Sequence, residues 1–95
     1  MPFLTQTARP FTRERVESIT PLGQMGVYGL YKGDRWIYIG RGDIRERLLA
    51  HLNGDNPCIT REAPTHWVDE VTAAHVAREQ ELLREISTAC NQRVG

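Results

Sequence analysis

Two short runs of β-branched and aromatic residues, separated by a polar turn, form the clearest hydrophobic pattern in the chain. The runs are Val27–Tyr31 and Trp36–Ile39, and Lys32-Gly33-Asp34 stands between them. Residues of this kind favour β-strands, and a short connection that contains glycine favours a hairpin. The sequence therefore predicts a β-hairpin.

Helical spacing follows in two later segments. Asp43 is a good N-cap residue, Asn53-Gly54 is a stop signal, and apolar residues recur between them as Ile44, Leu48 and Leu52. A second helix is predicted from Ala73 to about Thr88, where helix-forming residues predominate. Its expected apolar face consists of Val76, Leu83 and Ile86, with Leu82 beside it.

The rest of the chain completes an α/β plan of the α+β kind. Residues 1–21 have mixed polarity and contain three prolines, so they are expected to form an N-terminal arm with an edge strand near residues 16–19. Residues 55–64 are expected to form a loop, and residues 65–71 a third strand. The prediction is one domain over residues 22–95, with a three-stranded antiparallel sheet flanked by helices.

Composition places the chain in a broad class. Its 95 residues suffice for one domain, and 40% hydrophobic with 25% charged residues is typical of soluble globular proteins. No apolar run approaches the length needed to cross a membrane, and the N-terminus lacks the layout of a secretory signal. We therefore expect no membrane partner and a cytoplasmic location. Cys58 and Cys90 are too few for a disulfide scaffold and are expected as reduced thiols. With His66 and His75 they lack the paired spacing of a zinc site.

Charge is balanced overall but uneven along the chain. The net charge is zero, which argues against gripping nucleic acid by bulk electrostatics alone. Residues 1–51 carry eight basic and five acidic side chains, whereas residues 52–95 carry four and seven. One basic side of the molecule therefore remains possible, and four cations are candidates to line a nucleic-acid path, with solvated surface charge as the alternative: Lys32, Arg35, Arg41 and Arg45.

Glu79 is the most unusual residue of the second predicted helix, because its spacing places a carboxylate within the apolar face. An unpaired buried carboxylate is costly, so a partner is required. A salt bridge or a boundary position would supply it. The alternative is a metal ligand, since Mg²⁺ binds through one or two carboxylates, keeps several waters and takes phosphate oxygens as further ligands.

Four further residues carry candidate chemistry. Arg47 and His51 stand four apart on the first helix and project from one side, where they can hold a phosphate and handle a proton, or can belong to a solvated face.

Tyr28 and Tyr38 share one face of a regular hairpin only if the loop has an odd number of residues. A three-residue loop would place them directly opposite each other. Packing is the default explanation for each tyrosine, and for Trp36 and Trp67, which can otherwise stack on bases.

Together these positions resemble the GIY-YIG endonuclease family, whose domain occurs in homing endonucleases, in the first-incision module of bacterial nucleotide-excision repair and in some restriction enzymes. Gly26-Val27-Tyr28 resembles the first motif, and Tyr38-Ile39-Gly40 matches the second. The remaining similar positions, in the order of the family, are Arg47, His51, Glu79 and Asn91. Two features depart from the family pattern: the interval from Gly40 to Arg47 is about one residue short, and Thr88-Ala89-Cys90 lacks a proline.

The resemblance implies a metal-dependent hydrolysis of phosphodiester bonds in nucleic acid, with DNA as the expected substrate and Mg²⁺ or Mn²⁺ as the cofactor. It implies that Glu79 holds the metal, Arg47 neutralises the phosphoryl oxygens, Tyr28 orients or deprotonates water beside His51, Tyr38 contacts the phosphate or water, and Asn91 holds the loop or helps to position Tyr28. A monomer or weak homodimer is expected. The alternative function is a non-catalytic nucleic-acid-binding or protein-interaction module that keeps the fold.

Overall fold

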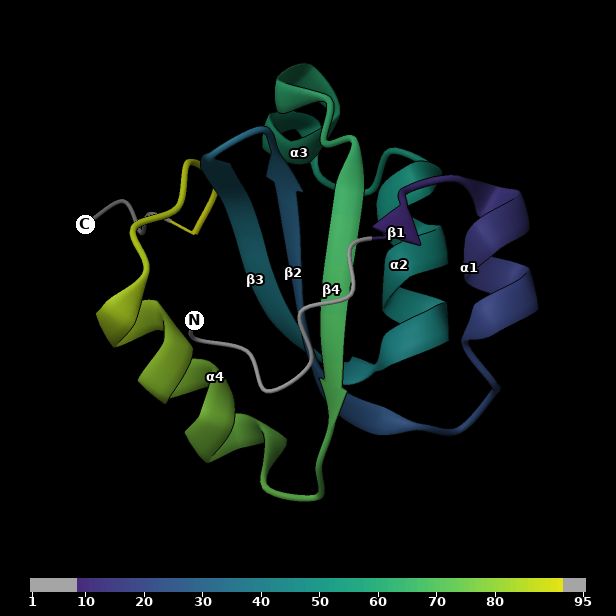
Figure 1. Cartoon of the computed structure of the whole chain (residues 1–95), viewed down its shortest axis with the longest axis vertical. Helices are drawn as coiled ribbons and strands as arrows, with labels where there is room; N and C mark the ends of the chain where they lie inside the picture. Colours follow the sequence, from purple (N-terminus) through teal and green to yellow (C-terminus); the bar gives the residue numbers. More distant parts are fainter. Residues whose placement is uncertain (1–8, 92–95) are drawn as a thin grey trace.

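An antiparallel sheet forms the middle of the protein (Figure 1). The computed structural model describes residues 9–91, and within them the sheet has four strands in the order β1-β4-β2-β3. Their bounds are β1 Arg9–Pro10, β2 Met25–Lys32, β3 Arg35–Asp43 and β4 His66–Val71. The hairpin and the strand after it are confirmed. The expectation of three strands is wrong, because the short β1 pairs with the outer side of β4.

Helices cover both faces of the sheet (Figure 1). Helices α1 (Arg13–Ile19), α2 (Ile44–Leu52) and α3 (Pro57–Glu62) pack on one face, and α4 (His75–Glu85) packs on the other, against β2 and β3. Each face has its own apolar cluster, with Leu48 and Trp67 in the first and Leu82 in the second. No helix within residues 9–91 has the length and apolar character needed to cross a membrane.

The two predicted helices form, but the second differs from the prediction in its bounds and in its buried face. In α2 the Asp43 side chain accepts a hydrogen bond from the Glu46 backbone N–H, which confirms the expected N-cap. Helix α4 is shorter than expected at both ends and buries Leu82, with Ile86 at its C-cap. The predicted face is partly wrong, because Val76 is 47% exposed.

Two segments that were expected to lack helix are helical. Residues near Val16 form α1, not an edge strand, since the Thr12 side chain accepts from the Arg15 N–H and Val16 is fully buried in the core. The segment expected as a loop contains α3, where Asn56 caps the helix and Pro57 occupies its first turn. Residues 9–21 thus pack into the domain, and residues 1–8 of the expected arm lie outside the described residues.

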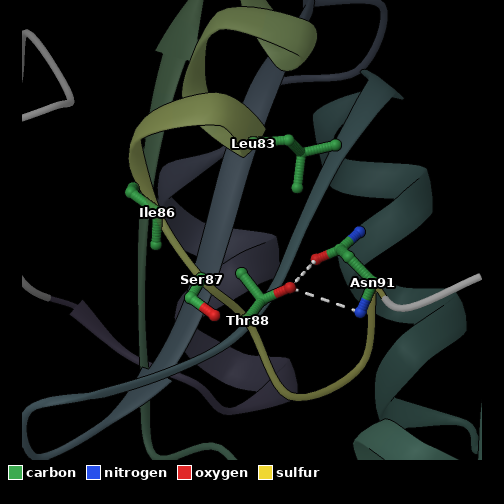
Figure 2. A pocket seen from close by; sticks show the side chains of 5 residues that line it. All are labelled: Leu83, Ile86, Ser87, Thr88 and Asn91. Atoms are coloured by element: carbon green, nitrogen blue, oxygen red, sulfur yellow. Dashed lines mark hydrogen bonds between the residues drawn. The ribbon is translucent and has the colours of Figure 1, made fainter.

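The segment after α4 runs along the outer edge of β3. The Ala89 and Cys90 backbone N–H groups donate to the Trp36 and Ile37 carbonyls, at 3.2 and 2.8 Å. Figure 2 shows Thr88 and Asn91 linked by hydrogen bonds. Together with Leu83, Ile86 and Ser87 they line an open hollow of about 230 Å³. The pairing covers part of a sheet edge that would otherwise present unsatisfied backbone groups.

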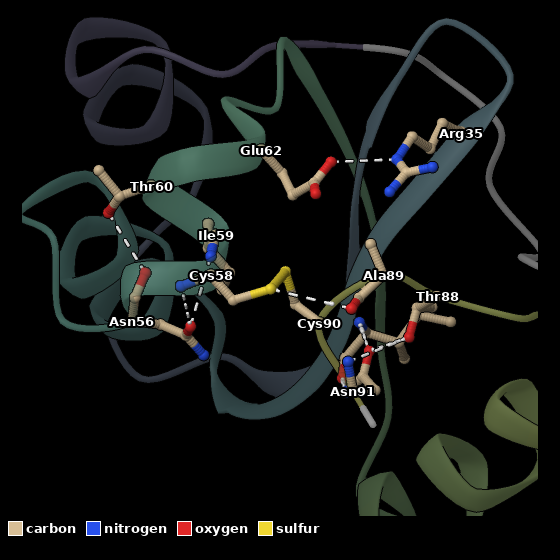
Figure 3. Close-up of a disulfide and its surroundings, with 11 residues drawn as sticks. Arg35, Asn56, Cys58, Ile59, Thr60, Glu62, Thr88, Ala89, Cys90 and Asn91 are labelled. Atoms are coloured by element: carbon tan, nitrogen blue, oxygen red, sulfur yellow. Dashed lines mark hydrogen bonds and ion pairs between the residues drawn. A yellow bond between two sulfur atoms is a disulfide. The ribbon is translucent and has the colours of Figure 1, made fainter. Parts of the chain in front are cut away.

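A disulfide joins Cys58 of α3 to Cys90 of this C-terminal segment (Figure 3). The Cα atoms are 5.7 Å apart, within the usual range for a disulfide. The expectation of two reduced thiols is therefore wrong. The fold brings the two cysteines together although 32 positions separate them in the sequence, which local patterns do not reveal.

Loss of this disulfide is expected to destabilise the protein. Closing a loop of 32 residues restricts the unfolded chain, which corresponds to about 3 to 4 kcal/mol of stability. Denaturation in urea, with and without a dithiol reductant, measures the difference for the wild type. The Cys58→Ser/Cys90→Ser variant should have the lower stability and show no response to reductant; equal stability of the oxidised and reduced wild type would contradict the prediction.

Candidate active site at the edge of the sheet

Tyr28 lies in the middle of β2 and points into the α1–α3 face of the sheet. It is 0% exposed, and its Oη atom is 2.6 Å from Nε2 of His51. Burial raises the pKa of Tyr28 well above its ordinary value, the nearby Tyr38 raises it further, and the Arg47 guanidinium lowers it. The phenol is therefore a neutral hydroxyl that hydrogen-bonds a buried imidazole.

His51 stands in the last turn of α2, and its imidazole is enclosed. The Nδ1 atom is 2.7 Å from Oδ1 of Asp55, in the turn that follows the helix. Burial lowers the pKa of His51, and the Asp55 carboxylate partly offsets this. At neutral pH the ring is thus uncharged and links Tyr28 to Asp55.

A β-bulge turns Tyr38 toward the same site. Leu30 pairs with Tyr38 and Tyr31 with Trp36, so Ile37 is an extra residue in β3. The turn itself has two residues, not the odd number that would bring the two tyrosines to one face of a regular hairpin. The bulge supplies the missing odd residue, so Tyr28 and Tyr38 share a face of the sheet. Because Tyr28 pairs with Gly40, the two tyrosines are diagonal neighbours and do not lie directly opposite each other.

The Tyr38 ring closes the site from the β3 side. Its centroid lies 6.2 Å from that of Tyr28 and 5.1 Å from that of His51. Burial raises the pKa of Tyr38, and the Glu79 carboxylate raises it further. Tyr38 is only half-buried, so part of its ring is open to the surface, whereas Tyr28 is enclosed.

Gly40 makes room for the Tyr28 phenol. A Cβ atom at this position would lie 2.5 Å from Cζ of Tyr28 and 2.8 Å from Cε2 of Tyr38. No side chain fits there unless the rings move. The glycine of the second tripeptide motif therefore has a packing role within the site.

Gly40→Ala is accordingly expected to destabilise the protein by about 1 to 3 kcal/mol, the usual cost of overpacking a core. Urea denaturation of Gly40→Ala, Tyr28→Phe and the double variant forms a cycle that measures the coupling of the two positions. The two changes should not be additive, because a Cβ atom at position 40 would meet the hydroxyl that Tyr28→Phe removes. Additive effects, or an unchanged stability of Gly40→Ala, would mean that the Tyr28 hydroxyl does not lie against position 40.

Arg47 lies one turn before His51 and faces the same side of α2. One guanidinium nitrogen is 3.2 Å from Oδ2 of Asp55, and the group is near enough to Tyr28 and Tyr38 to affect both phenols. Burial alone would lower the pKa of Arg47, but Tyr28, Asp55 and Tyr38 raise it by more, so the pKa lies above its ordinary value. Arg47 is thus a partly exposed cation beside the two phenols, held by Asp55.

Glu79 approaches from the other face of the sheet, on α4. Its Oε1 is 3.4 Å from Nε of Arg41, and its side chain is 22% exposed. The required partner of the carboxylate is therefore an arginine of β3. Within residues 9–91 no group of three or more His, Cys, Asp or Glu residues could hold a metal ion. One partly exposed carboxylate still fits an ion such as Mg²⁺ that takes most of its ligands from water and phosphate.

Asn91 makes its side-chain hydrogen bonds with the backbone of β3 and with its own segment. Its Oδ1 accepts from the Ile39 N–H at 2.7 Å and its Nδ2 donates to the Ile39 carbonyl at 2.8 Å. Thr88 Oγ1 donates to the same Oδ1 at 2.7 Å. Asn91 thus pairs with the edge of β3 between Tyr38 and Gly40 and holds the strand, with no contact to Tyr28.

Sequence reasoning missed Asp55, which contacts two of the predicted residues. It was assigned to a loop without chemistry, although its position four residues after His51 is the spacing at which helical side chains meet. Trp67, considered for base stacking, is instead a fully buried core residue. The cysteines considered for zinc are joined to each other.

Searches of the chain against protein-family models, curated proteins and solved structures returned no match.

Proposed function

We propose that this chain is a metal-dependent endonuclease that hydrolyses phosphodiester bonds in nucleic acid, with DNA as the expected substrate. The observation that carries the proposal is the hydrogen bond between Tyr28 and His51, with Tyr38 and Arg47 directly beside it. Tyr28 comes from β2, Tyr38 from β3, and Arg47 and His51 both come from α2, so three elements bring together four of the residues that the GIY-YIG resemblance implies. The α+β fold, in which both tripeptide motifs lie on paired strands, supports a GIY-YIG fold as part of the same proposal.

Tyr28 and His51 would handle the proton of the attacking water. A phenol is a weak base at neutral pH, and burial makes the phenolate of Tyr28 still less available. His51 resolves this difficulty because its neutral ring can accept the phenol proton while the phenol oxygen accepts a proton from water. The hydroxide formed in this way attacks phosphorus, and the bond from phosphorus to the sugar oxygen breaks.

Arg47 would bind the phosphoryl oxygens. Its guanidinium has a fork of donors that suits a phosphate, and at present it rests on the Asp55 carboxylate. A phosphate at the mouth of the site would take the place of that carboxylate as its partner. Charge that develops on the phosphoryl oxygens is then stabilised by a cation that is already positioned.

Glu79 would hold the metal ion through its carboxylate, beside Tyr38. When bound, a divalent cation there would polarise the phosphate and stabilise the leaving oxygen. Arg41, now paired with Glu79, would then be available to the nucleic-acid backbone. A monomeric or weakly dimeric state belongs to this proposal as well. So does a cytoplasmic location, although the Cys58–Cys90 disulfide is unusual for a reducing compartment.

The second candidate function is a non-catalytic nucleic-acid-binding or protein-interaction module. It is favoured by a specific observation: Tyr28 is fully buried, and Arg41 and Arg47 both rest on carboxylates of the same chain. A site closed in this way would bind a partner without turnover.

A plasmid-nicking assay with Mg²⁺, with Mn²⁺ and with a chelator separates the two functions. A single site cuts one strand, so the nuclease should convert supercoiled plasmid to the nicked circle and should stop when the metal is removed. The Glu79→Ala variant provides the inactive comparison. Protein that binds DNA but nicks it with neither metal would reject the nuclease and favour the second candidate.

A further inference from the structure

Asp55 binds two residues of the candidate site with its two carboxylate oxygens. Oδ1 is 2.7 Å from Nδ1 of His51, and Oδ2 is 3.2 Å from a guanidinium nitrogen of Arg47. Both partners lie on the preceding helix. Asp55 therefore connects the imidazole and the cation of the site through one side chain.

The backbone fixes the place of this carboxylate. The Asp55 N–H donates to the Ala50 carbonyl at 3.2 Å, and the Gly54 N–H donates to the His51 carbonyl at 3.1 Å. Gly54 has a φ of +84°, a conformation that glycine adopts readily at the end of a helix. The turn thus returns Asp55 to the helix it has just left, next to the two side chains that it binds.

The contacts set the direction of every hydrogen bond in the chain from Tyr28 to Asp55. An ionised carboxylate only accepts, so Nδ1 of His51 must carry the proton that it shares with Asp55. In a neutral ring Nε2 then has a lone pair, and it faces the Tyr28 hydroxyl at 2.6 Å. Tyr28 therefore donates to His51, and His51 donates to Asp55.

An ordinary surface ion pair would not fix which nitrogen of a histidine carries the proton. The Asp55 side chain is 34% exposed, and its contact with Arg47 alone would contribute little. The His51 side chain, in contrast, is 1% exposed, so its two nitrogens depend on protein partners. Without Asp55 the buried ring would have no carboxylate to select which nitrogen carries the proton.

We propose that Asp55 is a positioning residue that fixes His51 in the Nδ1–H form, so that Nε2 is ready to accept the phenol proton of Tyr28. The same carboxylate holds Arg47 beside that phenol until a phosphate replaces it. The tautomer follows from the contacts of a buried, neutral ring, whereas its effect on turnover rests on the proposed nuclease function. The two parts are therefore tested by separate measurements.

The tautomer is measured by NMR of the histidine ring nitrogens, with His51→Gln to identify the His51 signals among those of the three histidines. The wild type should show a protonated Nδ1 and an unprotonated Nε2 at neutral pH. Asp55→Ala and Asp55→Asn should shift His51 toward the Nε2–H form or a mixture. Glu62→Gln, which removes the carboxylate of the exposed pair with Arg35, is the matched control and should leave His51 unchanged. An unchanged tautomer in both Asp55 variants would overturn the proposal.

Turnover is measured separately on plasmid DNA with Mg²⁺. Asp55→Ala and Asp55→Asn should each lower kcat about 10- to 100-fold, because each removes a residue that orients a catalytic side chain. KM should not rise, because removal of a carboxylate leaves Arg47 free for phosphate and makes the site more positive. If the wild type does not nick DNA, the proposed function fails while the NMR result still decides the role of Asp55 in the tautomer. A rise in KM with unchanged kcat would instead mean that Asp55 only supports binding.

Discussion

Replacing Glu79 by alanine is expected to lower Mg²⁺-dependent cleavage by about a thousandfold or more, while the fold persists. A metal ion contributes several kcal/mol of charge stabilisation to a phosphoryl-transfer transition state, and each ~1.4 kcal/mol is a factor of ten in rate. The Glu79 carboxylate on α4 raises the pKa of Tyr38, so its charge acts on that phenol. Its side chain is partly exposed, so its removal leaves no large cavity.

Glu85→Ala is the matched control for this change. It removes the same charge from an exposed position on the same helix, so it should retain cleavage and show the effect of charge alone. Binding of Mn²⁺, followed by electron paramagnetic resonance, gives a readout that does not depend on activity. Glu79→Ala should bind the ion more weakly than Glu85→Ala, and equal binding with preserved cleavage would remove Glu79 from the metal site.

The pair between Glu79 and Arg41 offers a different explanation that the same experiment can test. If Glu79 serves only to anchor Arg41, then Arg41→Ala should reproduce the loss seen in Glu79→Ala at every Mg²⁺ concentration. A metal ligand behaves differently, because excess Mg²⁺ should partly rescue Glu79→Ala and should leave Arg41→Ala unaffected. The dependence on Mg²⁺ concentration therefore separates the two roles.

The hairpin and α2 could be predicted because their signals are local. Alternating β-branched and aromatic residues mark the strands, and Asp43 marks the start of the helix through its own side chain. Helix α1 was missed since its one buried residue, Val16, creates no period, and its signal is the Thr12 cap alone. Helix α3 had a local signal in Asn56-Pro57, which was assigned to a loop because prolines and asparagine are common there.

The candidate site shows the same division between local and long-range information. The spacing of Arg47 and His51 fixes their common direction on α2, and the structure brings both to Tyr28. The shared face of the tyrosines required an odd residue, but the sequence did not show whether that residue lies in the turn or, as in the structure, in a bulge at Ile37. The bulge depends on how β3 packs on both faces, with Ile37 in one apolar cluster and Ile39 in the other.

Contacts between distant segments could not be read from spacing at all. Cys58 and Cys90 meet only because α3 and the C-terminal segment both reach β3. Arg41 meets Glu79 only because α4 packs against β3 from the face opposite to α2. Each contact follows from the order in which the chain covers the two faces of the sheet, which no local pattern encodes.

Replacing Tyr28 by phenylalanine is expected to lower cleavage about 100- to 10,000-fold, the range that positioned proton transfer contributes to catalysis. The change removes one hydroxyl from a fully buried ring and leaves the packing on Gly40 in place. His51 loses the donor at its Nε2, so stability should fall by about 1 to 3 kcal/mol, the cost of an unsatisfied buried acceptor. The rate falls because no phenol remains to pass a proton from water to the imidazole.

Tyr31→Phe is the matched control, since Tyr31 lies on the same strand but packs in the α4 cluster, away from His51. It should keep wild-type cleavage. Single-turnover nicking rates and urea denaturation of both variants measure the two effects independently. The loss of activity in Tyr28→Phe should exceed what its fraction of unfolded protein explains, because a loss of 1 to 3 kcal/mol leaves a stable domain largely folded. Cleavage by Tyr28→Phe at the rate of Tyr31→Phe would mean that water is activated by another group, and Tyr38, the half-buried phenol beside it, would be the next residue to test.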